Sequence, residues 1–163
     1  RTTDQLFIIR TLLQQAKHSK RKLYCCFVDF KKAFDLVPRD SLWEVLKKRG
    51  MSGRVLSSLQ SMYEQDKACV LTSEGPTAMF DCSIGVKQGC PASPLLFSLY
   101  LDELETLLED ASEQTDCPRL AQLLIAILLF ADDIALFSYS QKGLQHQLDI
   151  SQEFVAARGL SVD

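Results

Sequence analysis

The sequence predicts an α+β fold in which helices pack on one face of an antiparallel sheet. Apolar residues recur at helical spacing in several segments, while continuous apolar runs rich in β-branched and aromatic residues mark strands. The order of strand, helices, hairpin, helix, hairpin and helix is typical of this class. With 163 residues, 47% hydrophobic and 24% charged, the chain has the size and composition of one globular domain.

The first third of the chain predicts one helix and one strand. Thr2 and Gln5 have the spacing of a capping box, and apolar residues follow at helical intervals, so a helix is expected to about Lys17. Residues 23–28 form a continuous apolar run, which is typical of a strand covered on both faces. Asp29 closes this strand.

The middle of the chain predicts two short helices followed by a hairpin. Asp40 and Ser52 are suitable N-caps for the two helices, and Gly50 ends the first of them. Residues 68–84 predict a hairpin whose loop is residues 73–77, because that loop combines serine, glycine and proline.

The last part of the chain predicts a long helix, a hairpin and a final helix. Ser93 is expected to cap the long helix, because Pro94 suits the first helical position. Residues 109–119 are acidic and irregular and are expected to form a surface loop. The final helix begins at Ser140 and ends at Gly159, and the last residues start one more strand.

Two adjacent carboxylates, Asp132 and Asp133, interrupt the apolar run 124–138 where the second hairpin would turn. Burying two ionised side chains is costly unless a cation or a hydrogen-bonded partner compensates. A tight turn can present both at its tip, and hard cations such as Mg2+ are held by carboxylates together with phosphates. The alternative is an Asp-Asp turn that only joins two buried strands.

Charge is unevenly distributed along the chain. Residues 1–54 carry 13 Lys and Arg against 5 Asp and Glu, whereas residues 55–163 carry 5 against 16. This asymmetry suggests that one face meets a polyanion. The alternative is a set of solvated helix faces.

Cysteine usage and hydropathy give an expectation for the compartment. The six cysteines lack zinc-finger spacing. Adjacent Cys25 and Cys26 lie in an apolar run and are interpreted as small buried hydrophobic residues, which argues against a disulfide framework. No apolar stretch is long enough to span a bilayer, and no signal-peptide pattern opens the chain. We therefore expect an intracellular protein of the nucleus or cytoplasm that is not secreted and has no membrane partner.

Three segments carry a specific pattern of residues. They are Val28-Asp29-Phe30-Lys31-Lys32-Ala33-Phe34-Asp35, residues 85–100, and Phe130-Ala131-Asp132-Asp133. Their order, spacing and flanking sequence closely resemble three successive palm motifs of reverse transcriptases, most closely those of non-LTR, LINE-type retrotransposons. The resemblance covers essentially the whole chain. It implies a polymerase palm-like antiparallel sheet with part of the fingers, and a domain fragment at residues 1–163 that lacks the thumb.

The resemblance implies a two-metal polymerase site. Asp29, Asp132 and Asp133 would hold two Mg2+ ions, with Mn2+ as a possible substitute, and the backbone carbonyl of Phe30 would add a ligand. Two such ions, about 3.5 to 4 Å apart, clamp the attacking and leaving oxygens of phosphoryl transfer. The implied activity is RNA-directed DNA polymerisation, which adds dNTPs to a DNA primer on an RNA template. Asp29 taken alone could instead bond the turn after its strand.

The other motif positions imply contacts with nucleotide and nucleic acid. Phe34 matches an aromatic steric gate against a ribonucleotide 2′-hydroxyl, and Gln88 and Gly89 match a loop along the incoming nucleotide and template. The basic first third, with Lys31 and Lys32, is expected to track nucleic acid where fingers meet template and triphosphate. Phe34 could instead be a core residue, and the loop that carries Gln88 and Gly89 could be an ordinary strand-to-helix connection.

Two other functions remain open from the sequence. The same fold could be a catalytically silent nucleic-acid-binding domain, although three intact carboxylates argue against it. It could also be a telomerase-like polymerase, although the amino-acid sequence of residues 88–97 favours a retroelement. Because the chain begins at Arg1 and lacks thumb, endonuclease and most of the fingers, we expect the isolated fragment to be weakly active or inactive. Asp35 is interpreted as structural, bonding nearby backbone.

Overall fold

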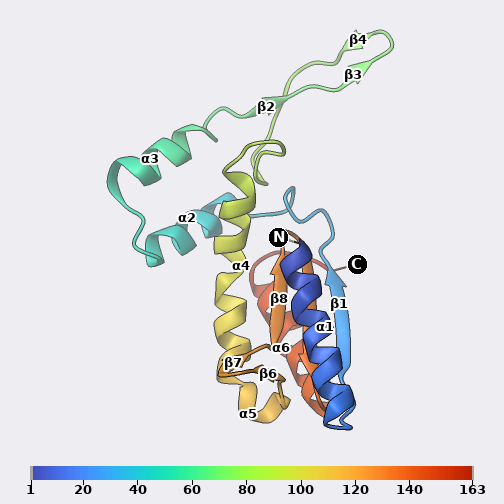
Figure 1. The fold of residues 1–163 in the computed structure, drawn as a ribbon. Coiled ribbons are helices and arrows are strands. Elements are labelled where there is room, and N and C mark those ends of the chain that lie inside the picture. Colours follow the sequence, from blue (N-terminus) through green and yellow to red (C-terminus); the bar gives the residue numbers. More distant parts are fainter. Residues whose placement is uncertain (1, 163) are drawn as a thin grey trace. The chain divides into compact units, whose positions relative to one another are not determined.

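The computed structural model describes residues 2–162 (Figure 1). The chain forms two compact units. Unit 1 comprises Arg1–Ala33 and Leu101–Asp163, and unit 2 comprises Phe34–Tyr100. The long helix α4 (Ser93–Asp110) begins in unit 2 and continues into unit 1. Within residues 2–162, no helix is both long enough and apolar enough to cross a membrane.

Unit 1 is built around a three-stranded antiparallel sheet in the order β1-β9-β8. Its elements are α1 (Thr2–His18), β1 (Tyr24–Asp29), the end of α4, α5 (Ser112–Thr115), β6 (Arg119–Leu120), β7 (Leu123–Leu124), β8 (Ile127–Phe130), β9 (Asp133–Ser138) and α6 (Gln141–Ala157). This arrangement confirms the predicted α+β class and its antiparallel sheet.

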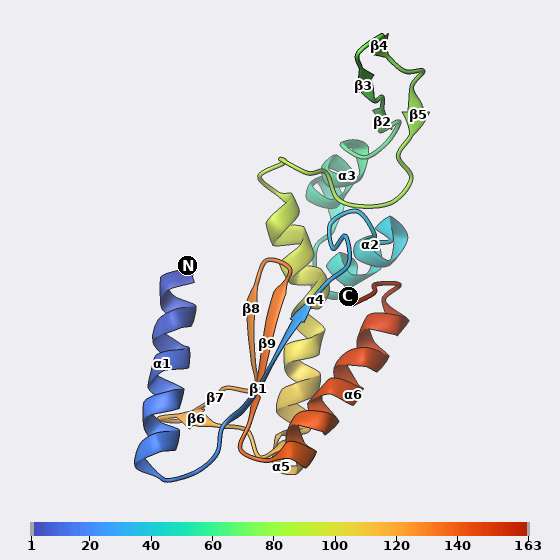
Figure 2. The ribbon, with the colours of Figure 1, turned by 90° about the vertical axis from the view of Figure 1, so that its right-hand side faces the viewer.

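Helices lie on the two faces of this sheet (Figure 2). Alternate residues of β9 face opposite sides. Leu12 of α1 clusters with Ala135 and Phe137, whereas α6 packs against β9 from the side on which Ile134 and Leu136 lie. The prediction placed helices on one face, and α1 adds cover on the other. The centre of unit 1 is therefore β9, which is bonded on both sides and buried from Ile134 onward.

The strand β1 forms where it is predicted, but its expected burial on both faces is wrong. β1 is an edge strand whose exposure alternates along its length. Phe27 is 73% exposed, Cys25 is exposed and Cys26 is only partly buried. A continuous apolar run has the composition of a central strand, but composition alone does not reveal which neighbours pair with it.

Helix caps agree with the prediction at α6 and differ at α1. The side chain of Ser140 accepts a hydrogen bond of 3.0 Å from the backbone N–H of Gly143, and Gly159 has a φ of 68° after the helix ends. At α1 the capping-box interpretation is wrong, because Gln5 Oε1, which would accept from the N–H of Thr2, has no partner among residues 2–162. The Gln5 amide instead donates from Nε2 to the backbone carbonyl of Leu129, 3.1 Å away. Gln5 thus ties α1 to β8.

The expected surface loop at 109–119 is also wrong. It contains the short helix α5 and the first strand of the β6–β7 hairpin, and Thr115 and Cys117 are buried. The Ser138 hydroxyl donates to the Thr115 carbonyl, and the Gln147 amide contacts the Cys117 sulfur. Burial raises the pKa of the Cys117 thiol. The acidic composition of this segment therefore gave no indication that Thr115 and Cys117 are buried.

Unit 2 consists of helices and a long, broken hairpin. Its elements are α2 (Arg39–Lys48), α3 (Gly53–Ser61), β2 (Lys67–Ala68), β3 (Leu71–Thr72), β4 (Gly75–Pro76), β5 (Phe80–Asp81) and the start of α4. β2 pairs with β5 and β3 with β4, so the turn is Ser73-Glu74 and shorter than predicted. Pro38, and not Asp40, occupies the N-cap position of α2.

Candidate active site

Asp29 and Asp133 lie directly opposite each other on neighbouring strands. Asp29 is the last residue of β1, Asp133 is the first residue of β9, and the two are register partners. Cα atoms of such cross-strand partners lie about 4.5 to 5.5 Å apart, with both side chains on the same face. Both side chains are exposed. The fold thus brings together carboxylates that are far apart in the sequence.

Asp132 lies beside this pair, in the turn between β8 and β9. Phe130 pairs with Asp133, so the turn is Ala131-Asp132, and the predicted Asp-Asp turn is wrong by one residue. Ala131 has a φ of 55°, a left-handed conformation that costs a non-glycine residue conformational energy. The turn therefore places two carboxylates at consecutive positions, one in the bend and one in the strand.

The donors at this tip suit a hard divalent cation, because all three are carboxylates. Within residues 2–162, however, no three Asp, Glu, His or Cys side chains are gathered closely enough to hold a metal ion. Phe30, whose carbonyl is the predicted fourth ligand, is buried and forms an isolated antiparallel bridge with Val162. The backbone placement fits the predicted site, and metal binding by these residues stays a prediction.

A cavity of about 320 Å³ runs between α1 and the sheet and ends at the carboxylates. Asp29 and Asp133 line it together with Gln5 and mainly apolar side chains. The Gln5 side-chain oxygen is buried there and has no hydrogen-bond partner among residues 2–162.

The predicted nucleotide-binding residues lie together in unit 2. Phe34, Gln88 and Gly89 line an open cavity of about 550 Å³ with four other residues, Lys87, Cys90, Ser93 and Pro94. Phe34 is half-buried, and its ring centroid lies 5.2 Å from that of Phe97. One part of the ring therefore packs in the core while another borders the cavity, a placement between the two alternatives weighed for this residue.

The loop that carries Gln88 is bound to the segment that carries Phe34. The backbone N–H of Val86 donates to the Phe34 carbonyl at 2.7 Å. The Gln88 side chain donates from Nε2 to Oδ1 of Asp35 at 2.8 Å. The interpretation that Asp35 bonds nearby backbone is wrong, because its carboxylate accepts from a side chain that is distant in sequence.

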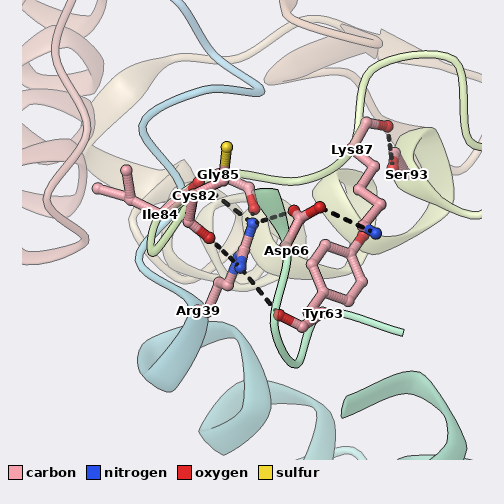
Figure 3. A network of polar contacts seen from close by, with 8 residues as sticks. All are labelled: Arg39, Tyr63, Asp66, Cys82, Ile84, Gly85, Lys87 and Ser93. Atoms are coloured by element: carbon pink, nitrogen blue, oxygen red, sulfur yellow. Dashed lines mark hydrogen bonds and ion pairs between the residues drawn. The ribbon is translucent and has the colours of Figure 1, made fainter. Parts of the chain in front are cut away.

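A partly buried arginine, Arg39, connects four other parts of unit 2 (Figure 3). The Arg39 guanidinium donates to the carbonyls of Tyr63, Cys82 and Gly85, at distances from 2.6 to 3.2 Å. It also pairs with the Asp66 carboxylate at 2.8 Å. This network was missed from the sequence, because only the fold brings its members together.

Lys87 extends this network towards the cavity. Its ammonium lies 3.1 Å from Oδ1 of Asp66, and its carbonyl accepts a hydrogen bond from the Ser93 hydroxyl at 2.6 Å (Figure 3). Burial alone would raise the pKa of Asp66, but hydrogen bonds and charges from Lys87 and Arg39 outweigh it and lower that pKa. The Asp66 carboxylate therefore stays ionised and helps hold the start of the Gln88 loop.

Basic residues of the first third lie at both ends of β1. Lys31 and Lys32 are exposed and follow Asp29 at one end of β1. Lys20 and Lys22 precede Tyr24, at the other end, and β1 spans about 17 Å at roughly 3.3 Å per residue. Contact of the basic first third with nucleic acid stays a prediction, and these two groups of lysines allow it to be tested separately.

A family model described as reverse transcriptase (RNA-dependent DNA polymerase) matches residues 1–163. The chain is 29% identical over 161 residues to the Pol polyprotein of the type-2 retrotransposable element R2DM of Drosophila melanogaster. It is 26% identical over 168 residues to the RNA-directed DNA polymerase of the mobile element jockey of Drosophila funebris. These alignments cover 98% and 99% of this chain but 15% and 18% of the relatives, so the chain spans less than a fifth of their length.

Solved structures of telomerases share the fold. Telomerase from Candida albicans, in a complex with a fragment of telomeric RNA, superposes with a TM-score of 0.76 at 14% identity and covers 100% of this chain and 30% of that one. Apo telomerase from Candida tropicalis gives a TM-score of 0.69 at 18% identity, covering 99% of this chain and 30% of that one. At these identities the likeness concerns the fold alone.

Proposed function

Because the chain belongs to the reverse transcriptase (RNA-dependent DNA polymerase) family, we propose that it forms the catalytic core of a non-LTR retrotransposon polymerase. In this proposal the protein adds deoxynucleotides from dNTPs to the 3′-OH of a DNA primer on an RNA template. The observation that carries the proposal is the direct cross-strand pairing of Asp29 with Asp133, with Asp132 in the adjoining turn.

Reverse transcriptases use divalent metal ions. We propose that Asp29, Asp132 and Asp133 hold two Mg2+ ions, with Mn2+ as a substitute and the Phe30 carbonyl as a further ligand. Bound there, the ions would neutralise charge on the attacking and leaving oxygens. Cross-strand pairing keeps the backbones of Asp29 and Asp133 side by side, so both side chains start from the same end of the sheet.

The nucleotide and the nucleic acid would be bound by other residues of the chain. Phe34 would lie against the sugar of the incoming nucleotide, where its ring excludes a 2′-hydroxyl. Gln88 and Gly89 would follow the nucleotide and the template, and Gly89, with a φ of 81° and open space around its Cα, permits a close backbone approach. Lys31 and Lys32 would contact phosphates.

Carboxamide variants test the proposed site. In the longest form of the protein that carries this chain, Asp29→Asn and Asp133→Asn should lower primer extension by about a thousandfold or more, because several kcal/mol of transition-state stabilisation are lost. Asp110→Asn, on the exposed end of α4, is the matched control and should retain activity. Primer extension on an RNA template and a thermal unfolding curve are the measurements.

The result has a clear contrary outcome. If the Asn variants extend the primer as fast as the wild type while remaining folded, the assignment of Asp29 and Asp133 is wrong. A wild-type protein that binds primer and template but extends nothing, with either metal ion, would identify the chain as a catalytically silent binding domain.

A further inference from the structure

We propose that Asp35 is a positioning residue that fixes the side chain of Gln88 and thereby sets affinity and selectivity for the incoming nucleotide. The inference rests on the proposed function, because it concerns the cavity that Phe34, Gln88 and Gly89 line. It assigns a role to a residue that neither borders that cavity nor belongs to the three carboxylates at the tip of the sheet.

The contact itself determines which end of the amide is held. Nε2 of Gln88 donates to Oδ1 of Asp35 over 2.8 Å. An ionised carboxylate only accepts hydrogen bonds, so the Gln88 NH2 group must face Asp35 and its carbonyl oxygen Oε1 is left for other partners. Without Asp35, a glutamine at this exposed position could rotate about its side-chain torsions and present either end of its amide.

The backbone around this contact is already fixed. Val86 donates to the carbonyl of Phe34, and Gly85 donates to the carbonyl of Val37, at 2.7 and 2.9 Å. A Cβ at Gly85 would lie 2.7 Å from the Asp35 carbonyl oxygen, so the two segments touch closely. The main freedom that remains to Gln88 is therefore in its side chain, and the hydrogen bond to Asp35 restricts it.

Asp35 also connects the two walls of the cavity. It follows Phe34 directly in the chain, so one short segment supplies the aromatic wall and holds the Gln88 side chain. If the Gln88 side chain were free to rotate, the width of the cavity beside the Phe34 ring would no longer be fixed. We therefore expect that loss of Asp35 weakens nucleotide binding and reduces discrimination against ribonucleotides, and that it does so only through Gln88.

A double-mutant cycle tests this dependence. Asp35→Ala and Gln88→Ala should each raise the KM for dNTP about tenfold, the effect expected when a hydrogen bond to a charged group is lost. The double variant should be no worse than Gln88→Ala alone, because Asp35 acts only through Gln88. Asp35→Asn keeps an acceptor oxygen, so its KM for dNTP should stay close to that of the wild type. Asp40→Ala, another exposed aspartate of unit 2, is the control and should have no effect.

The outcomes separate this inference from the proposed function. The same cycle is measured as the Kd of a fluorescent dNTP, which does not require catalysis, and thermal unfolding of each variant is recorded. Additive losses in the double variant, or a lowered melting temperature with unchanged KM and Kd, would overturn the role of Asp35. A wild type that binds dNTP and shows the coupling but never extends a primer would refute only the proposed function.

Discussion

Phe34 is the residue whose two possible roles can be separated most sharply. Its ring is half-buried against Phe97 and borders the cavity of unit 2. If it excludes a 2′-hydroxyl by overlap, Phe34→Val should admit ribonucleotides while largely preserving deoxynucleotide addition, because removing a clash needs no new attraction. The measurement is the ratio of kcat/KM for dNTP over rNTP, together with a melting curve.

Phe97 provides the matched control for this test. It is fully buried on the other side of the same ring contact, so Phe97→Leu should lower stability by about 1 to 1.5 kcal/mol and leave the selectivity ratio unchanged. If Phe34→Val instead lowers the melting temperature with no change in the ratio, Phe34 is a packing residue and the choice of deoxynucleotides has another origin.

At the scale of elements, the loop after Ile84 depends on one glycine for its close approach to Asp35. Gly85 and Gly50 both have a φ of +87°, but only at Gly85 would a Cβ meet backbone atoms, the nearest at 2.7 Å. Gly50→Ala should therefore cost only the left-handed strain, about 1 to 2 kcal/mol. Gly85→Ala should cost about 1 to 3 kcal/mol more, because the neighbouring segment must move.

Urea unfolding of the two variants measures this difference. The Gly85 variant should also raise the KM for dNTP, since displacing the loop moves Gln88, while the Gly50 variant should not. Equal destabilisation of the two variants would show that the loop adapts at no cost and that its contact with Asp35 is not rigid.

For the whole molecule, the sequence indicates the candidate site residues but not the residues, such as Arg39 and Asp35, that hold the surrounding segments in place. The chemistry of metal binding indicates Asp29, Asp132 and Asp133, whereas Phe34 and Gln88 are indicated by the resemblance to reverse transcriptases. Arg39 is indicated by neither, because its partners lie on segments that only the fold brings together. The same reason explains Asp35, whose partner is 53 positions away.

Fold prediction has the same limit at the level of elements. The ends of α6, marked by Ser140 and Gly159, are confirmed because a cap bonds within its own turn, whereas the cap predicted at Asp40 is not formed. The burial of β1 and the structure of residues 109–119 depend on neighbours that are distant in sequence. Local composition does not contain that information.

The two basic clusters of unit 1 should differ in their effect on nucleic-acid binding. Each phosphate contact contributes about 0.7 to 0.9 to the slope of log K against log salt concentration. The double variant Lys31→Gln, Lys32→Gln, next to Asp29, should reduce the magnitude of this negative slope by about 1.5. Lys20→Gln with Lys22→Gln, at the other end of β1, should leave it unchanged. Titration of the binding of a primer and template at several salt concentrations measures both slopes, and equal reductions would contradict the assignment.

The position of β9 in the centre of the sheet has a consequence for local stability. Its amides are held between two strands, whereas β1 lies at an edge and the Ala131-Asp132 turn is bonded on neither side by a strand. Hydrogen exchange should therefore be slowest along β9 and faster at the end of β1 and in the turn. Asp133 would then act as the fixed point of the tip, and any approach of the three carboxylates to one another would come from Asp29 and Asp132.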